Sequence, residues 1–437
     1  MKVVKFGGSS LADSIQFKKA IEIIRSDPSR TVVIVSAPGK RNFSDTKITD
    51  LFYEWVRNEK EGFSCKDVSE TIEQRYLEIV EGLGLKFDVK TEIKRIGHII
   101  QSLQCCTATY EASRGEYLSG RIMAEALGFD FVHPEDCIRF EEFGDKHIKE
   151  DDHVREIIGD RKVVIPGFYG AVIHRSEKIR TFSRGGSDLT GAIIARALGA
   201  EVYENWTDVS GLLMCDPRIV SDPPFISEVT YKEVRELSYM GANVFHEEAM
   251  FPVQEAGIPT NIRNTDDPTH PGTFIRSYLP PLSDGHVITG IAGRRGFTII
   301  TIEKMLMNKE IGFARKVLSV LEDEEISFEH MPGGIDTLSI VINNDLISDK
   351  REGLMAGIRE AVDWDTIKTS SDIALIAIVG RRLLEKPETT SMIFSALAKH
   401  EISCQLITQG SSELSIIIGV DGDQYESAIR AIYQRFK

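Results

Sequence analysis

Cysteine is scarce in this sequence, and its spacing favours free thiols. The 437 residues include six cysteines, and Cys105 and Cys106 are adjacent inside a helical pattern. No two of them have the C-x2-C spacing that is typical of zinc sites. We therefore expect reduced thiols, as in a cytosolic protein, and we nominate no metal-binding residue. The other four are Cys65, Cys137, Cys215 and Cys404.

Long hydrophobic runs and an excess of positive charge are also lacking. No apolar run approaches the ~20 residues that a membrane-spanning helix needs, and no signal peptide opens the chain. The 52 Lys and Arg residues are outnumbered by 67 Asp and Glu, so the formal net charge is −15. No basic run offsets this charge, which argues against nucleic acid as a partner. We expect a cytoplasmic protein that binds neither membranes nor nucleic acid.

Short β-branched runs alternate with helical patterns up to Arg263. This alternation predicts a three-layer α/β domain with a mostly parallel sheet. From Leu51 to Thr109 the strand signal disappears, and we expect two or three helices there. A zone rich in Pro, Gly and Asp, from Asp266 to Pro281, marks the end of the domain. The expected strands are Val3–Val4, Thr31–Val35, Lys162–Ile165, Val202–Trp206 and Thr260–Arg263.

The stretch from Lys5 to Ser10 is the first candidate for a functional loop. It follows a buried strand, contains Gly7 and Gly8, and precedes a helix that begins near Asp13. A glycine turn between a strand and a helix N-terminus can bind an anion through bare N–H groups and the helix dipole. Lys5 adds a full positive charge. Taken alone, such a stretch is more often an ordinary turn than a phosphate site, because it is neither a Walker A motif nor a dinucleotide fingerprint.

Two further loops carry charged residues at expected helix starts. Glu116 follows Arg114 and Gly115, and Asp188 follows two glycines and Ser187. Acids in the first turn of a helix are commonly caps or dipole partners, so both residues have a structural alternative. An arginine such as Arg184 can hold a carboxylate through two parallel hydrogen bonds.

The last third of the chain contains an internal repeat with an offset of 76 residues. Glu325–Ser327 matches Glu401–Ser403, and Leu338–Ile340 matches Leu414–Ile416. Each copy is expected to run strand, helix, strand, strand, helix, which predicts two small ferredoxin-like βαββαβ modules.

Seven segments, in this order along nearly the whole chain, resemble the aspartokinases of the amino-acid kinase superfamily. The tail modules resemble the regulatory ACT domains of these enzymes, in which the first module is inserted into the second. The segments are Lys5–Ser10, Val35–Ala37, Gly115–Glu116, Arg184–Asp188, Trp206–Asp208, Asp216–Arg218 and Gln409–Glu413.

The resemblance implies phosphoryl transfer from MgATP to the β-carboxylate of L-aspartate. The product would be 4-phospho-L-aspartate, the first intermediate in lysine, threonine and methionine biosynthesis. The resemblance also implies a catalytic domain over residues 1–283, a first ACT module over 299–370, and a second built from 287–298 and 371–437. The chemistry suits the residue types, because a carboxylate nucleophile needs no general base and the transferring group needs its charge neutralised.

The resemblance further implies roles for individual residues. Lys5 would neutralise the moving phosphoryl group and Asp188 would position Lys5. Glu116 would hold the ammonium group of aspartate, and Arg184 its α-carboxylate. Ser36, Thr49 and Ser187 would be further substrate contacts. The residues expected around the nucleotide, besides Lys5, are Phe6, Gly7, Gly8, Ser9, Thr207, Asp208, Leu213, Arg218, Asn243 and Val244.

The first tail module matches the family's effector site. A free amino acid there would present its ammonium group to Glu329 and its carboxylate to the helix start at Phe313. An acid suits a cationic ligand, so lysine is favoured over threonine; the alternative is that Glu329 is a solvated strand residue. Edge strands favour a homodimer through the ACT modules, with a tetramer as the alternative. The matching residues are Met307, Asn308, Gly312, Ala314, Ser327, Phe328 and Glu329.

The chain departs from the family pattern in two places. Many members carry a lysine where this chain has Asn243, so either Lys5 and magnesium suffice or Lys40 or Lys47 approaches. Leu213 replaces a frequent aromatic, so base stacking there is not expected. Two other functions fit the fold, namely phosphorylation of another acidic amino acid such as glutamate, and amino-acid sensing without catalysis.

Overall fold

The computed structural model describes the chain except for residues 103–107, 143–146, 174, 184, 243–244, 246, 281–287, 382, 384–385 and 410–413. The chain divides into two compact units. Unit 1 comprises Met1–Leu212, Phe225–Val234 and Val244–Leu279, and unit 2 comprises Leu213–Pro224, Arg235–Asn243 and Pro280–Lys437.

Unit 1 is built on an eight-stranded sheet with the order β3-β5-β2-β1-β8-β10-β11-β9. The strands from β3 to β10 are parallel, and β11 runs antiparallel to β10. The expected mostly parallel sheet is therefore confirmed. The strand bounds are β1 Lys2–Phe6, β2 Arg30–Val35, β3 Asp130–Phe131, β5 Val163–Pro166, β8 Val202–Thr207, β9 Glu228–Thr230, β10 Thr260–Asn264 and β11 Thr273–Arg276.

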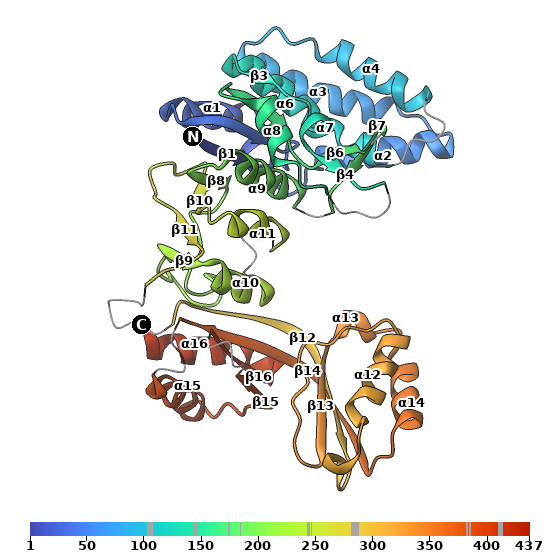
Figure 1. The fold of residues 1–437 in the computed structure, drawn as a ribbon, viewed down its shortest axis with the longest axis vertical. Coiled ribbons are helices and arrows are strands. Elements are labelled where there is room, and N and C mark those ends of the chain that lie inside the picture. The colour runs from blue at the N-terminus through green and yellow to red at the C-terminus, as the bar shows by residue number, and fades with distance from the viewer. Residues whose placement is uncertain are drawn as a thin grey trace. The chain divides into compact units, whose positions relative to one another are not determined.

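Helices cover both faces of this sheet and complete the three layers (Figure 1). One face, which includes Val4 and Phe6, packs into a core with α1 (Ser14–Ser26), α6 (Arg114–Leu127) and the helices between them. Because side chains alternate along a strand, Lys5 projects from the opposite face. That face carries α9 (Gly186–Leu198), against which α8 (Asp151–Ile158) and α11 (Glu247–Glu255) pack.

The predicted helical excursion consists of three helices. They are α2 (Ile48–Glu61), α3 (Lys66–Leu83) and α4 (Val89–Ser102), and they pack in sequence beside one another. Gly62 and Gly84 end α2 and α3 in the left-handed conformation, which glycine adopts without strain. The rest of the region holds α5 (Ala108–Ala112), α7 (Pro134–Cys137) and a small sheet of β4 (Arg139–Phe140), β6 (Tyr169–Val172) and β7 (Arg175–Thr181).

Unit 2 contains one five-stranded sheet in the order β13-β12-β14-β16-β15. Its two long strands, β12 (Gly290–Glu303) and β14 (Thr366–Val379), run through both predicted modules (Figure 1). The first half of β12 pairs with the end of β14, and the second half also pairs with β13. The other elements are β13 Thr337–Asn343, β15 Leu406–Gln409, β16 Ser415–Asp421, α12 Phe313–Asp323, α13 Asn344–Ile347, α14 Arg351–Ala361, α15 Pro387–Lys399 and α16 Tyr425–Phe436. The residues of α10 (Tyr231–Tyr239) are divided between the two units.

The strand order predicted for the first module is wrong at one position. Its second strand is reduced to isolated bridges, His330 with Val341 and Gly333 with Leu338. Pro332 cannot donate to a sheet ladder, and the glycines beside it weaken strand structure, so regular pairing stops there. In the described part of the chain, no helix is long and apolar enough to span a membrane.

Candidate active site

The centre of the candidate site is an ion pair between a strand and a helix. Lys5 of β1 is 7% exposed, and its Nζ lies 2.5 Å from Asp188 Oδ1 in the first turn of α9. Asn205 of β8 donates from Nδ2 to the same carboxylate oxygen at 3.0 Å. The strand end and the helix start that the sequence singled out are thus brought together.

Asp188 does not cap its helix. The N-cap of α9 is Gly185, whose φ of 67° lies in the left-handed region that favours glycine. Tyr203 of β8 donates from its hydroxyl to the main-chain oxygen of Asp188 at 3.0 Å. A Cβ on Gly191 would lie 2.5 Å from that hydroxyl, so the glycine lets α9 approach β8 closely. The capping alternative for Asp188 is therefore wrong, and its carboxylate is free to serve Lys5.

The glycine loop after β1 packs backbone against backbone on the loop after β2. Gly39 donates from its main-chain N–H to Gly8 O at 2.8 Å. A Cβ on Gly39 would lie 2.7 Å from the carbonyl carbon of Gly8, and one on Gly7 would lie 3.4 Å from Lys5 Nζ. Gly7, Gly8 and Ser9 therefore follow the cationic strand end closely, as the sequence predicted for a phosphate-binding turn.

The expected helix N-terminus does not contribute to this turn. A 3-10 turn, η1 (Ser9–Leu11), separates the glycines from α1. The carboxylate of Asp13 caps α1 and accepts the main-chain N–H groups of Ile15 and Gln16, both at 2.9 Å. Because that negative charge already occupies the helix N-terminus, the prediction that α1 supplies bare N–H groups to an anion is wrong.

Arg75, which no sequence motif singles out, holds both loops through hydrogen bonds. Its guanidinium lies in α3, is 3% exposed, and donates to Gly39 O at 2.9 Å and to Ala12 O at 3.3 Å. It also donates to Asp45 Oδ2 at 2.9 Å and to Thr46 O at 3.3 Å. A single buried cation therefore joins the glycine loop to the loop after β2.

A cavity of about 140 Å³ lies beside these loops. Lys40 lines it, whereas Lys47, the other lysine suggested as a substitute for Asn243, is the N-cap residue of α2. Asn243 and Val244 lie outside the described residues. The residues lining the cavity are Ser9, Ser10, Ala12, Asp13, Gln16, Lys40, Arg41, Thr207, Asp208, Thr265 and Asp266.

Of the other residues predicted to contact the nucleotide, one lies in unit 1 and two lie in unit 2. Phe6 is buried in β1 and stacks on Trp206 at 6.0 Å between ring centroids, so its side chain faces the core. Leu213 and Arg218 belong to unit 2. There the exposed guanidinium of Arg218 pairs with Asp216 Oδ2 at 2.7 Å.

Glu116 is a buried acid that forms no ion pair within 4 Å among the described residues, although the Arg114 guanidinium lies near enough to lower the pKa of its carboxyl somewhat. It is 5% exposed, and its Oε2 has no hydrogen-bond partner among the described residues. Burial raises the pKa of its carboxyl to about 8, although main-chain hydrogen bonds from Ala37 and from its own residue oppose the shift. The dipole-partner alternative does not explain such burial, whereas a ligand with an ammonium group would complete the pair.

The residues expected around the substrate are only partly described. Arg184 lies outside the described residues. Ser187 is buried in α9, Thr49 lies in the first turn of α2, and Ser36 donates from its main-chain N–H to Phe6 O at 3.2 Å. A Cβ on Gly167 would lie 2.7 Å from the Ser187 side chain, so the loop after β5 packs on the start of α9.

Phe168, in that loop, is a strained residue that the sequence did not reveal. Its φ of 79° is uncommon for a residue with a side chain. The strain is held by hydrogen bonds from Phe168 N to Thr190 Oγ1 at 3.1 Å and from Phe182 N to Phe168 O at 2.9 Å. Strained backbone of this kind is concentrated at functional sites.

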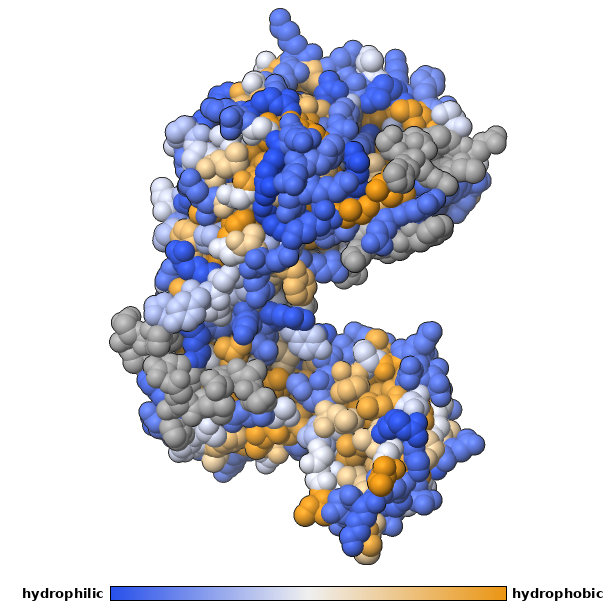
Figure 2. All heavy atoms as spheres, viewed as in Figure 1, coloured by the Kyte–Doolittle hydropathy of each residue, from blue (hydrophilic) through white to orange (hydrophobic). Residues whose placement is uncertain are grey.

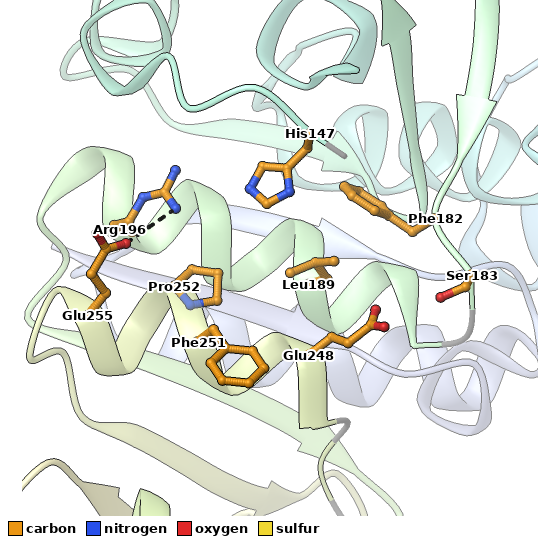
Figure 3. A pocket seen from close by; sticks show the side chains of 9 residues that line it. All are labelled: His147, Phe182, Ser183, Leu189, Arg196, Glu248, Phe251, Pro252 and Glu255. Carbon is orange, nitrogen blue, oxygen red and sulfur yellow. Dashed lines mark ion pairs between the residues drawn. The ribbon is translucent and has the colours of Figure 1, made fainter. Parts of the chain in front are cut away.

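A larger cavity, of about 520 Å³, lies against another side of α9 (Figure 3). Phe182, Leu189 and Pro252 give it an apolar wall. At one end Arg196 is neutralised by Asp151 at 2.8 Å and Glu255 at 3.9 Å. Neither Lys5 nor Glu116 lines this cavity, so it is distinct from the cluster described above.

The predicted effector residues all lie in unit 2. Met307 and Asn308 form a 3-10 turn with Lys309, and Gly312 is the N-cap of α12, which Ala314 continues. Ser327 and Phe328 precede Glu329, whose main-chain N–H donates to Val341 O at 2.8 Å. The half-buried carboxylate of Glu329 accepts a hydrogen bond from the hydroxyl of Tyr239 in α10.

The described acids do not form a metal cage. In the part of the chain that the structure covers, no three His, Cys, Asp or Glu side chains cluster to hold a metal ion. This donor set still fits Mg²⁺, which is commonly held by one or two carboxylates and the phosphates of a nucleotide. Asp208, on the small cavity, is a carboxylate placed for that purpose, whereas Asp188 is engaged by Lys5 and Asn205.

Two family models match the sequence. Residues 1–264 match the amino acid kinase family, and residues 376–436 match an ACT domain. The chain is 36% identical to Aspartokinase 3 of Bacillus subtilis (strain 168), covering 100% of this chain and 98% of that protein. It is 28% identical to a bifunctional aspartokinase/homoserine dehydrogenase of Haemophilus influenzae, covering 99% of this chain and 56% of that protein.

Solved structures give a consistent picture. The crystal structure of Clostridium acetobutylicum aspartate kinase matches with a TM-score of 0.94 and 46% identity, covering 100% of both chains. E. coli aspartokinase III in complex with lysine and aspartate matches with a TM-score of 0.77, covering 100% of this chain and 99% of that chain. Its identity is 22%, so that likeness concerns the fold alone.

Proposed function

The chain belongs to the aspartokinase group of the amino acid kinase family and is an aspartate kinase, and on this basis we propose how it carries out and regulates the reaction. It transfers the γ-phosphoryl group of ATP to the β-carboxylate of L-aspartate and forms 4-phospho-L-aspartate. This is the first step in the biosynthesis of lysine, threonine and methionine. The observation that carries the proposal is the buried Lys5–Asp188 ion pair beside the glycine loop.

Lys5 supplies positive charge to the transferring group. The β-carboxylate of aspartate, with an ordinary pKa of ~4, is already ionised at neutral pH and attacks without a general base. The barrier then depends on alignment and on neutralising the negative charge that gathers on the phosphoryl oxygens. Lys5 is cationic and nearly buried, and Asp188 holds its Nζ at 2.5 Å. Water therefore screens this charge little.

Glu116 and Arg184 recognise the two charged groups of the amino acid. The buried carboxylate of Glu116, which lacks a close cation among the described residues, takes the α-ammonium group. Arg184 takes the α-carboxylate, and Ser36, Thr49 and Ser187 add hydrogen bonds. Binding of the ammonium group ionises Glu116, because a neighbouring positive charge lowers the pKa of an acid.

The nucleotide lies along the glycine loop and the small cavity. Gly7, Gly8 and Ser9 follow its phosphates, and Thr207 and Asp208 line its other side. Lys40 lines the same cavity and adds the charge that Asn243 cannot provide. Mg²⁺, when bound with the nucleotide, would neutralise phosphate charge, and Asp208 is the residue that would hold it together with the phosphates.

The ACT modules bind an end-product amino acid, and we favour lysine. Glu329 offers a carboxylate to the second ammonium group that lysine carries and threonine lacks. The α-carboxylate of lysine is placed at the start of α12, where Met307, Asn308, Gly312 and Ala314 lie. The catalytic domain covers residues 1–283, and the modules cover 299–370 and 287–298 with 371–437.

The modules also pair two copies of the chain. Several large apolar side chains of the first module are exposed, among them Met305 at 73% and Ile311 at 98%. On the face drawn in Figure 2, hydrophobic side chains gather over the part of unit 2 that carries α12, α13 and β13. Exposed apolar patches of this kind favour association, so a homodimer through the modules, and a tetramer in the inhibited state, are proposed. A cytoplasmic location fits an enzyme of amino-acid biosynthesis.

The test is direct detection of the acyl phosphate. Full-length protein with ATP, magnesium and L-aspartate should yield a hydroxamate when hydroxylamine is added. Lys5→Ala should lower kcat by about 10³-fold through lost charge stabilisation. Lys66→Ala removes a lysine whose side chain is 74% exposed and serves as the matched control. Hydroxamate no greater than that of Lys5→Ala, or an equal rate with L-glutamate, would contradict the proposal.

A further inference from the structure

Asn205 is a buried amide in the middle of the unit 1 sheet. It is 2% exposed and is the register partner of Lys5 on the neighbouring strand. The same row across the sheet continues to Ile34 on one side and Ile262 on the other. Registered residues of adjacent strands project from the same face. Lys5 and Asn205 are thus two neighbouring polar side chains flanked in this row by Ile34 and Ile262.

The amide is directed at the acid of the ion pair. Asn205 Nδ2 donates to Asp188 Oδ1 at 3.0 Å, and Lys5 Nζ lies 2.5 Å from that same oxygen. An ionised carboxylate can only accept, so the amide must present its NH₂ group and not its oxygen. The Oδ1 of Asn205 is buried and has no partner among the described residues. A leucine of similar size would avoid burying that oxygen, so packing alone does not explain an asparagine here.

The other contacts of Asp188 hold its main chain. Tyr203 donates to the main-chain oxygen of Asp188, and Gly191 allows α9 to lie close to the tyrosine ring. Neither contact decides which way the carboxylate turns about its side-chain bonds. That orientation depends on the two donors that reach Oδ1, of which Lys5 is flexible and Asn205 is short and fixed in a central strand.

We propose that Asn205 is a positioning residue for phosphoryl transfer, which holds the Asp188 carboxylate so that it keeps the Lys5 ammonium at the transferring group. The inference rests on the roles proposed above for Lys5 and Asp188. Without the amide, the carboxylate turns, Lys5 follows it, and the positive charge is misplaced while the substrates still bind. Loss of the amide should therefore slow the chemical step and lower kcat.

The test compares two buried asparagines in the full-length enzyme. Asn205→Leu removes the donor at nearly constant volume. Asn261→Leu is the matched control, because Asn261 is 4% exposed on β10, next to Ile262, and so projects from the other face of the sheet. We expect Asn205→Leu to lower kcat by about 10- to 100-fold, as small misplacements do, and Asn261→Leu to leave kcat unchanged. The KM values for aspartate and ATP should change by less than ~3-fold.

A pH profile separates positioning from a general loss of structure. Asn205→Asp places a second carboxylate beside Asp188, which raises the pKa of one of the two acids. Below that pKa the shared proton supplies a donor to Asp188 in place of the amide, so the kcat of Asn205→Asp should fall as the pH rises through it, whereas the kcat of Asn205→Leu should be low at every pH. A wild-type kcat in Asn205→Leu, or an equal loss in Asn261→Leu, would overturn the inference. The inference would also be overturned if Asn205→Leu is unfolded at the assay temperature and regains full activity at a lower temperature.

Two parallel variants show which proposal has failed. If Lys5→Ala and Asp188→Asn keep the wild-type kcat, the proposed site is wrong and the role of Asn205 falls with it. If both lose activity while Asn205→Leu retains it, only the positioning role of Asn205 is refuted.

Discussion

The hydroxyl of Tyr239 donates a hydrogen bond to the carboxylate of Glu329. Tyr239 is the last residue of α10, and Glu329 is the proposed anchor for the ammonium group of the effector. A bound lysine and Tyr239 would therefore compete for the same carboxylate. A ligand that takes Glu329 would break this hydrogen bond to the end of α10, which would couple the effector site to that helix.

This competition predicts that Tyr239→Phe sensitises the enzyme to lysine. A hydrogen bond to a charged group contributes ~1.5 kcal/mol, so half-inhibition should occur at about 10-fold lower lysine. Lysine titrations of the kinase rate would measure the shift. Tyr278→Phe, at a tyrosine that is 77% exposed, should leave the titration unchanged, and Glu329→Ala should abolish inhibition. An unchanged midpoint in Tyr239→Phe would refute the competition.

Glu116 predicts a pH-dependent affinity for aspartate. Burial raises the pKa of its carboxyl to about 8, and only the ionised form attracts the ammonium group. The kcat/KM for aspartate should therefore rise with pH up to about 8, and Glu116→Gln should remove this limb and lower kcat/KM by about 10²-fold. A wild-type profile without a limb near pH 8 would show that Glu116 is already ionised before aspartate binds.

The same residue predicts a stability effect of opposite sign. Because the folded pKa lies above the unfolded value of ~4.3, the stabilisation is fully present below that value and is lost as the pH rises through about 8. Glu116→Gln should therefore have a higher thermal midpoint than wild type at pH 9 without ligand, but not at pH 4. Calorimetry at the two pH values tests this, and added aspartate should remove the difference.

The contacts of Arg75 predict that replacing this residue weakens nucleotide binding, although it lies in a peripheral helix. Its two terminal nitrogens reach acceptors in two loops, and a lysine offers one nitrogen for all of them. Arg75→Lys should raise the KM for ATP by about 10-fold and lower the free energy of unfolding by about 2 kcal/mol. Arg155→Lys, at a surface pair with Asp152, is the control and should change neither quantity.

The close packing at Gly39 predicts that a single methyl group at this position disrupts the proposed phosphate-binding loop. An alanine Cβ there would lie 2.7 Å from the carbonyl carbon of Gly8, which is main chain and cannot rotate away. Gly39→Ala should therefore displace the loop and lower kcat/KM for ATP by about 10²-fold. Gly333→Ala adds a Cβ with nothing within 4 Å and should keep wild-type kinetics. Wild-type kcat/KM in Gly39→Ala would show that the two loops can separate at little cost.

The sequence predicted those parts of the site that follow strand ends and helix starts. Lys5, Glu116 and Asp188 lie at such positions, where a charged residue beside glycines is unusual enough to be noticed. Asn205 and Arg75 could not be found in this way. Asn205 lies inside a strand, and Arg75 lies in a helix rich in charged residues, where an exposed position is the ordinary expectation. Their partners are 17 and 36 residues away, and only the fold brings them together.

The same reasoning explains the errors in the predicted fold. The alternation of strands and helices was sufficient for the parallel sheet, because each buried strand shows in its own composition. The missing second strand of the first module was not evident, because the effect of Pro332 and the glycines depends on which strand would lie beside them. The role of Asp13 was missed because a cap and a ligand-binding turn share the same sequence signature.

The shared strands β12 and β14 couple the unfolding of the two tail modules. One half of each strand packs in one hydrophobic core and the other half packs in the second core. Unfolding of either core would therefore disrupt the β12–β14 hydrogen bonds that continue into the other module. The two modules should therefore unfold in a single cooperative transition. Excising residues 304–365 to isolate the second module would leave the far halves of β12 and β14 as a two-stranded ribbon without its hydrophobic core, and the fragment would aggregate through the exposed edges.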